Sequence, residues 1–73
     1  MSDLENRLLQ AHANGDTTAL IDLYQEAADA ASADDAKGFY LTHAYVFALE
    51  TGSPKANQIR DRLILMGREV PTG

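Results

Sequence analysis

The sequence predicts an all-α protein in which four helices form two antiparallel helical hairpins stacked on one another. Apolar residues recur every three or four positions in four successive segments, which is the spacing of a helix with one buried side. A glycine follows three of these segments, at Gly15, Gly52 and Gly67, where a left-handed cap ends a helix. The chain has 73 residues and no cysteine, so we expect one domain, residues 1–73, stabilised by helix packing without disulfides.

The first helix is predicted over residues 3–14. Ser2 and Glu5 have the spacing of a capping box, in which two side chains bond the free backbone N–H groups at a helix start. The apolar side of this helix carries Leu4, Leu8 and Ala11. We expect Leu9 and His12 on the outer side, together with Glu5.

The second helix is predicted over residues 17–31, directly after the glycine. Asp16 or Thr17 is expected to accept a hydrogen bond from the first turn. The apolar stripe carries Leu20, Leu23, Tyr24, Ala27 and Ala31. Alanine is the best helix former, so the alanine-rich run is expected to stay helical to its end. A polar connector, "SADD", follows, and its last residue, Asp35, is predicted to cap the next helix.

The third helix, predicted over residues 36–51, holds four of the chain's five aromatic residues and is apolar on nearly every side. A helix of this kind is typically covered by neighbours, so we expect it to be enclosed by the other three. Tyr40 and Phe47 are predicted core residues, and Phe39 and Tyr45 are predicted at the rim. A strand is the alternative, because tyrosine, valine and phenylalanine favour sheets, but no other segment offers a partner strand.

The fourth helix is predicted over residues 54–67. Ser53 is the expected N-cap, and Pro54 suits the first helical position, where its missing N–H costs nothing. The inward side carries Ile59, Leu63 and Met66. Residues 68–73 are predicted to form a loose tail.

The net charge of −5 is unevenly distributed along the chain. Residues 1–35 carry eight acidic residues and one basic residue, whereas residues 36–73 carry five basic and three acidic residues. Nucleic-acid binding depends on basic residues that neutralise phosphates, so the balance argues against it. The local exceptions are Lys55, Arg60, Arg62 and Arg68. The chain has neither a signal-peptide pattern nor an apolar run long enough for a bilayer, so we expect a soluble cytoplasmic protein without a membrane partner.

The two halves of the chain align at a shift of 37 residues through Leu4 and Leu41, Ala11 and Ala48, Gly15 and Gly52, and Ala19 and Ala56. This period is close to that of helical-repeat arrays. The second helix resembles the Sel-like branch of the tetratricopeptide repeats through Ala19, Leu23, Tyr24, Ala27 and Ala28. The second hairpin is similar to the general tetratricopeptide signature, with Tyr40 at its large aromatic position, Ala44 at its glycine, Phe47 at its tyrosine and Ala56 at the first alanine of the following helix.

The resemblance covers about residues 19–63. The chain departs from the pattern at His43, where leucine is usual, at Arg60, where an aromatic residue is usual, and at Arg68, where the terminal proline belongs. The resemblance implies a right-handed, tetratricopeptide-like stack of hairpins that holds other proteins. It implies no reaction.

No pattern of catalytic or metal-binding residues occurs in the sequence. The two histidines, His12 and His43, lie on different predicted helices, and no cysteine is available to complete a zinc site. So small a helical chain also leaves little room for a deep pocket. We therefore expect no enzyme activity, no catalytic residue, no metal and no cofactor.

The favoured hypothesis is a small protein–protein interaction module that binds a protein or peptide, or a second copy of itself as a homodimer. The candidate contact residues are Tyr24, Tyr40, His43, Tyr45 and Arg60. Tyrosine is prominent among them because its ring and hydroxyl serve interfaces well. The alternative hypothesis is a sensor of a small ligand or a metal, centred on His43.

Overall fold

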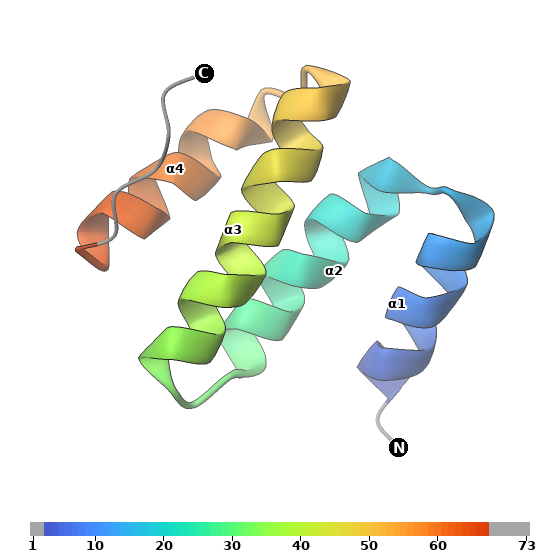
Figure 1. Cartoon of the computed structure of the whole chain (residues 1–73), viewed down its shortest axis with the longest axis horizontal. Helices are drawn as coiled ribbons and strands as arrows, with labels where there is room; N and C mark the ends of the chain where they lie inside the picture. Colours follow the sequence, from blue (N-terminus) through green and yellow to red (C-terminus); the bar gives the residue numbers. More distant parts are fainter. Residues whose placement is uncertain (1–2, 68–73) are drawn as a thin grey trace.

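The computed structural model describes residues 3–67, which form four helices and no strand: α1 (Asp3–Asn14), α2 (Thr17–Ala30), α3 (Asp34–Thr51) and α4 (Lys55–Leu65) (Figure 1). Each helix packs against the next one in the chain, most extensively α2 against α3. The prediction of an all-α stack of four helices is confirmed. The predictions for Ser2 and for residues 68–73 lie outside the described residues.

The helices form a flat body with extents of 31 × 29 × 14 Å (Figure 1). A thickness of 14 Å between Cα atoms leaves room for little more than two helices, since one helix with its side chains is about 10–12 Å wide. Every helix therefore keeps one side in contact with solvent.

The first and third helices end in the same way, at glycines 37 residues apart. Gly15 and Gly52 have φ angles of +64° and +66°, in the left-handed region that suits glycine. The hydrogen bonds at the two ends correspond: Gly15 N–H to His12 C=O (3.2 Å), Asp16 N–H to Ala11 C=O (2.9 Å), Gly52 N–H to Leu49 C=O (3.2 Å) and Ser53 N–H to Ala48 C=O (2.8 Å). Both ends are Schellman motifs, in which the turn satisfies carbonyls left free by the helix.

The starts of α2 and α4 follow the predicted capping chemistry. The Asp16 carboxylate accepts from the Ala19 N–H at 3.1 Å. Ser53 Oγ accepts from the Lys55 N–H at 3.2 Å, and Pro54 between them has helical dihedral angles. Side-chain oxygens thus bond free N–H groups at both starts.

Four helix boundaries differ from the prediction, and one of them is the start of α4 at Lys55, one residue after the predicted start. α3 begins at Asp34, two residues early, and the predicted cap Asp35 lies inside its first turn. Extended Ala33 precedes the helix instead, and acidic side chains in a first turn stabilise the helix through its dipole without capping it. α2 ends at Ala30 and α4 at Leu65, each slightly short of the predicted end.

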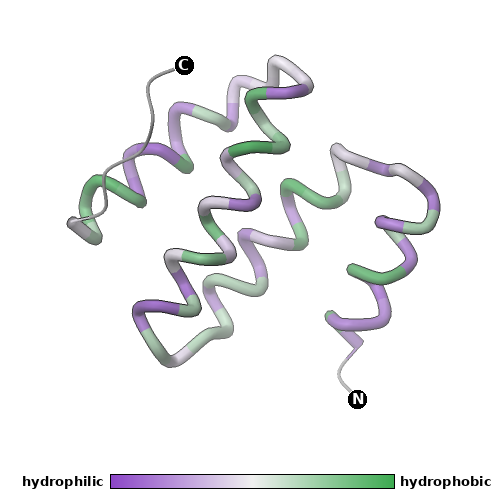
Figure 2. The backbone as a smooth tube through the Cα atoms, viewed as in Figure 1, coloured by the Kyte–Doolittle hydropathy of each residue, from purple (hydrophilic) through white to green (hydrophobic). Residues whose placement is uncertain are grey.

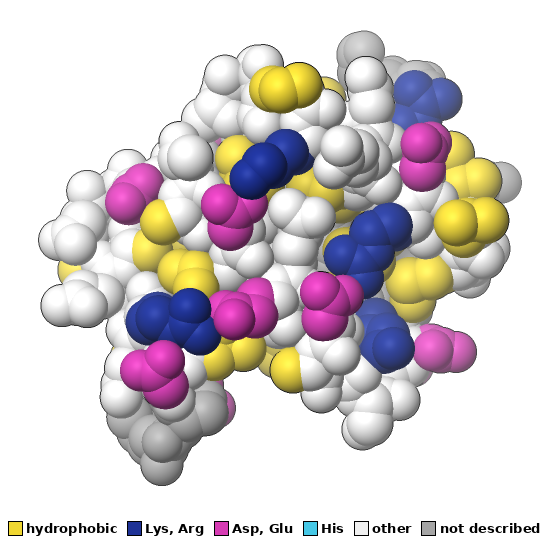
Figure 3. Space-filling view, turned by 180° about the vertical axis from the view of Figure 1, so that it is seen from behind, with side chains coloured by type: hydrophobic (Ala, Val, Ile, Leu, Met, Phe, Trp, Pro, Cys, Tyr) yellow, Lys and Arg dark blue, Asp and Glu magenta, His cyan; other side chains and the backbone are white. Residues whose placement is uncertain are grey.

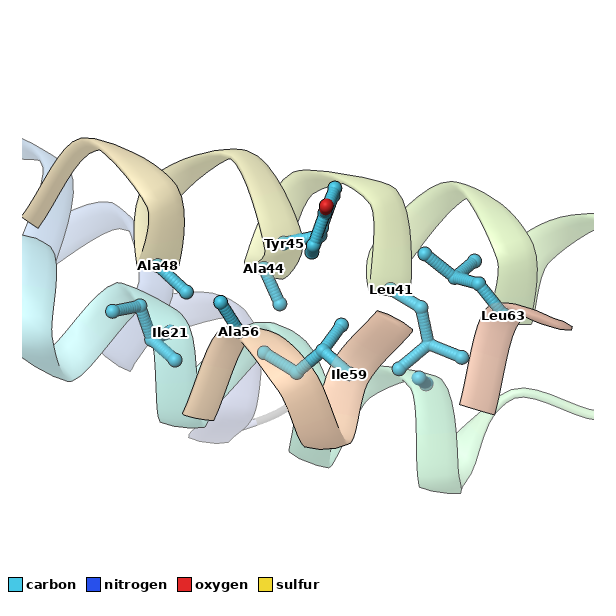
Figure 4. Close-up of a cluster of buried hydrophobic side chains, with 9 residues drawn as sticks. Ile21, Leu41, Ala44, Tyr45, Ala48, Ala56, Ile59 and Leu63 are labelled. Carbon is cyan, nitrogen blue, oxygen red and sulfur yellow. The ribbon is translucent and has the colours of Figure 1, made fainter. Parts of the chain in front are cut away.

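The main core lies between α2, α3 and α4 (Figure 4). Its buried residues are Ile21, Ala28, Leu41, Ala44, Tyr45, Ala48, Ala56, Ile59 and Leu63. Ala28, Ala44 and Ala48 have no exposed surface, and such small side chains let α2 and α3 approach closely. Tyr45, predicted at the rim, is only 6% exposed and belongs to this core.

The prediction that the third helix is enclosed on all sides is wrong for one side. Figure 2 shows apolar residues on successive turns of α3, but the core covers only part of its circumference. Phe39, Val46 and Leu49 remain 57%, 45% and 50% exposed. The physical reason is the flatness of the body: α2 and α4 pack against α3, and no described helix lies over its outer side.

Ion pairs cross the side of α2 that faces away from α3, and Figure 3 shows basic and acidic side chains next to one another on this back face. The residues of this ion-pair ladder are Asp3 and Arg7 of α1, Asp22, Glu26 and Asp29 of α2, and Lys55 and Arg62 of α4. The Arg7 guanidinium lies 2.8 Å from Glu26 and 3.0 Å from Asp3. Each exposed pair contributes about 0–1 kcal/mol, so the ladder aligns α1 and α4 on α2 more than it stabilises the fold.

Replacing Gly52 with alanine is expected to lower the free energy of unfolding by about 1–2 kcal/mol, because a Cβ disfavours the left-handed conformation. No heavy atom lies within 4 Å of the added Cβ, so the loss measures backbone conformation alone. Urea denaturation followed by circular dichroism checks this. Gly52→Asn is the matched control and should lose less, since asparagine tolerates this conformation. Equal stability of the alanine variant and the parent would contradict the prediction.

Candidate functional site

Six aromatic or imidazole rings from three helices form one cluster, and the Tyr24 ring contacts four of the other five. This ring cluster consists of His12 from α1, Tyr24 from α2, and Phe39, Tyr40, His43 and Phe47 from α3. The Tyr24 ring stacks on His43, with centroids 5.2 Å apart, and on Phe47, with centroids 5.8 Å apart. Such ring pairs add about 0.5–1.5 kcal/mol each beyond the area they bury. Tyr24 therefore joins α2 to α3 at this point.

His12 approaches Tyr24 from the first helix. Its Nε2 and the Tyr24 hydroxyl oxygen are 2.9 Å apart, at hydrogen-bond distance, and the two rings meet edge to face. His12 is exposed, as expected for the outer side of the first helix, but the prediction missed its contact with Tyr24 of α2. The spacing of Leu4, Leu8 and His12 was the available signal, because positions four apart lie on one side of a helix.

His43 directs one nitrogen to its own helix. Its Nδ1 lies 2.9 Å from the Phe39 carbonyl oxygen, and because a carbonyl oxygen only accepts, Nδ1 is the donor in this hydrogen bond. Thr42 Oγ1 donates in the same way to the Gly38 carbonyl at 2.7 Å. Thr42 Oγ1 and His43 Nδ1 are thus both bonded to carbonyl oxygens of α3 itself. The Thr42 methyl group and the His43 ring remain for other contacts.

Tyr24, Tyr40 and His43, three of the five predicted contact residues, lie together in the ring cluster. Tyr45 lies in the core shared with α4, where a partner has no access to it. Arg60 is exposed on α4 and has no place in the cluster. The prediction grouped the five residues by their chemistry alone. It therefore included Tyr45, which lies on another side of α3, and Arg60, which lies on another helix.

An open groove of about 390 Å³ continues from the ring cluster between α1 and the start of α3. Leu4 and Leu8 form one wall, Ala36 and Tyr40 the other, and Ala27 of α2 is at its base. Glu5 is the one charged residue among the described residues that line it. No histidine side chain is visible in the view from behind, where the charged side chains of the ion-pair ladder lie (Figure 3).

Burial raises the pKa of the Tyr24 hydroxyl above its ordinary value of 10.0, and the nearby Tyr40 raises it further because two phenolates would repel one another. The hydroxyl is therefore neutral at physiological pH. It serves as a hydrogen-bonding group and not as a charge.

Within residues 3–67, no group of three or more His, Cys, Asp or Glu side chains is placed to hold a metal ion. In the same part of the chain, no helix is long and apolar enough to cross a bilayer. Comparison with protein-family models, with curated proteins and with solved structures gives no match. The ring cluster and its groove are the features from which a function is argued.

Alkaline titration is expected to reveal the environment of Tyr24. The raised pKa means that the folded state keeps the proton better than the unfolded state, so this stabilisation is complete below about pH 10 and is lost as pH rises through the folded-state pKa. The free energy of unfolding from urea titrations should fall more steeply from about pH 9.5 to 11 in the parent than in Tyr24→Phe. Parallel curves would contradict this. At neutral pH, Tyr24→Phe should lose about 0.5–1.5 kcal/mol through the His12 hydrogen bond.

Proposed function

We propose that the chain is a small protein–protein interaction module that binds a protein or peptide on the surface around Tyr24, Tyr40 and His43. The observation that carries the proposal is the ring cluster, which three helices assemble next to an open apolar groove. Aromatic side chains bury large areas with little loss of conformational freedom, and they are enriched among the residues that dominate binding energies.

The distribution of charge supports the same face. On the back face, acidic and basic side chains are paired with each other across α1, α2 and α4. A partner on that face would have to replace ion pairs already made, at a desolvation cost. The groove is lined mostly by leucine, alanine and tyrosine side chains, with Glu5 and Ser32 as its polar members, and burial of the apolar part is favourable at about 25 cal/mol per Å².

The alternative proposal is a sensor of a small ligand or a metal, centred on His43. The chain's two imidazoles, which are the side chains suited to a divalent metal, both contact Tyr24: His12 edge to face and His43 by stacking. No third metal-binding side chain joins them among the described residues. Zinc titration followed by amide shifts around His43 separates the two functions, and saturating shifts at stoichiometric zinc would favour the sensor.

A photoreactive residue on the proposed surface is expected to capture the partner. Phe39 is an exposed member of the ring cluster, and para-benzoylphenylalanine in its place keeps an aromatic ring there. Irradiation in native lysate should give a specific covalent adduct from position 39. The matched control replaces Leu9, an exposed apolar residue of α1 outside the cluster, with the same photoreactive residue. Adducts of equal yield and identity from both positions would refute the site.

The double variant Phe39→Ala, His43→Ala should then weaken capture of that partner at least tenfold. Tyr24 and Tyr40 are left intact because they pack against the core, whereas Phe39 is mostly exposed and His43 is half-buried. Far-ultraviolet circular dichroism should remain helical. Undiminished capture by a folded double variant would show that the partner binds elsewhere.

A further inference from the structure

α1 buries fewer side chains than any other helix of the described chain. Ala11 is the one buried residue of α1, whereas α4, a helix of similar length, buries Ala56, Ile59 and Leu63. The main core between α2, α3 and α4 contains no residue of α1. α1 therefore adds little to the packing that joins the other three helices.

The packing of α1 depends on α2, next to which it lies at one edge of the body (Figure 1). Within residues 3–67, no Cα atom of α1 comes within 8 Å of a Cα atom in α3 or α4. The groove of about 390 Å³ lies between α1 and the start of α3. Two exposed polar contacts link α1 to α2: Arg7 to Glu26 at 2.8 Å, and His12 Nε2 to the Tyr24 hydroxyl at 2.9 Å. Exposed contacts of this kind stabilise a fold only slightly.

The turn after α1 forms a boundary between two parts of the chain. Gly15 is exposed, and no heavy atom lies within 4 Å of a Cβ placed on it, so the backbone has room to move there. The Asp16 carboxylate caps α2 through the Ala19 N–H. This cap lies wholly on the α2 side of the turn, so the start of α2 stays satisfied when α1 moves away.

A helix of the length of α1 is marginal on its own. α1 has 12 residues, and isolated helices shorter than about 12–15 residues are only partly formed in water. Its helical state therefore depends on contact with α2. When α1 leaves α2, it is expected to lose its helical hydrogen bonds as well.

We infer that α1 is a separate cooperative unit, which undocks and unfolds at Gly15 while α2, α3 and α4 stay folded. Leu20 and Ala27 of α2 are 3% and 5% exposed but lie outside the main core, and Ala27 lines the groove together with Leu4 and Leu8 of α1. Undocking uncovers this side of α2 and removes one wall of the groove. The width of the groove is thus controlled by the least stable helix of the protein.

Amide hydrogen exchange of the full chain, followed by NMR, tests the inference without any partner. Under conditions in which exchange reports the open population, the amides of residues 7–14 should exchange at least tenfold faster than the slowest amides of α3, after correction for intrinsic rates. Urea should accelerate exchange of the α1 amides less than half as steeply, because undocking of one helix exposes less surface than global unfolding.

Ile59→Val distinguishes local from global opening. It removes one carbon from the main core, which stays packed when α1 opens. The slowest amides of α3 should therefore exchange about two- to tenfold faster, as expected for this substitution in a core, while the amides of α1 keep the parent's rates within about twofold.

Leu8→Ala is the matched control, because Leu8 is half-buried on α1 and its loss weakens the docked state itself. Amides of both α1 and α3 should then exchange at least threefold faster, since both openings start from the docked state. Equal acceleration of α1 and α3 amides by Ile59→Val would overturn the inference, because α1 would then open only when the main core unfolds. Equal urea slopes for α1 and α3 in the parent would overturn it without any substitution.

Discussion

Close packing of α2 against α3 is the constraint on which the rest of this structure depends. Alanines without exposed surface at the contact let the two helices approach, and α1 and α4 are then added to opposite edges of the pair. The result is a flat body and not a closed bundle. With so little interior, the chain cannot bury all of its apolar residues, and the rings of α3 and the exposed residues of its outer side are what remain.

The local parts of the fold were predictable from the sequence because their causes are local. Gly15 and Gly52 end helices through their own backbone conformation, and Asp16 accepts from an N–H three residues away. The extent to which neighbouring helices cover α3 was not predictable from local sequence. An apolar residue on every turn shows that a helix is rich in apolar surface, but the number of neighbours that cover it depends on how the other helices pack. Phe39 and Tyr45 show the limit, since both were expected at the rim and only Phe39 is there.

The candidate site likewise contains some contacts that follow from local sequence and others that do not. Tyr40 and His43 are three residues apart on one helix, and their proximity follows from the helical repeat. Tyr24 and His12 come from two other helices, and no local pattern fixes the distance between their side chains. The sequence identified the useful chemistry at Tyr24 but not its hydrogen bond to His12, which depends on the way α1 packs against α2. Arg60 was grouped with these residues on chemistry, yet it lies on α4.

The flat shape also explains why the two faces differ in character. On the back face, α2 lies between α1 and α4, and its acidic residues at helical spacing meet basic residues from both neighbours. Charges that are paired within the protein are already satisfied, so this face has little to gain from a partner. On the opposite face, Thr42 and His43 turn a donor back to their own helix, and they leave an apolar surface with carboxylates near its ends. Under the proposed function, burial of that apolar surface would supply the affinity for a partner. The division of charge between the faces is thus the physical reason why the proposed binding surface is placed on the apolar side of so small a protein.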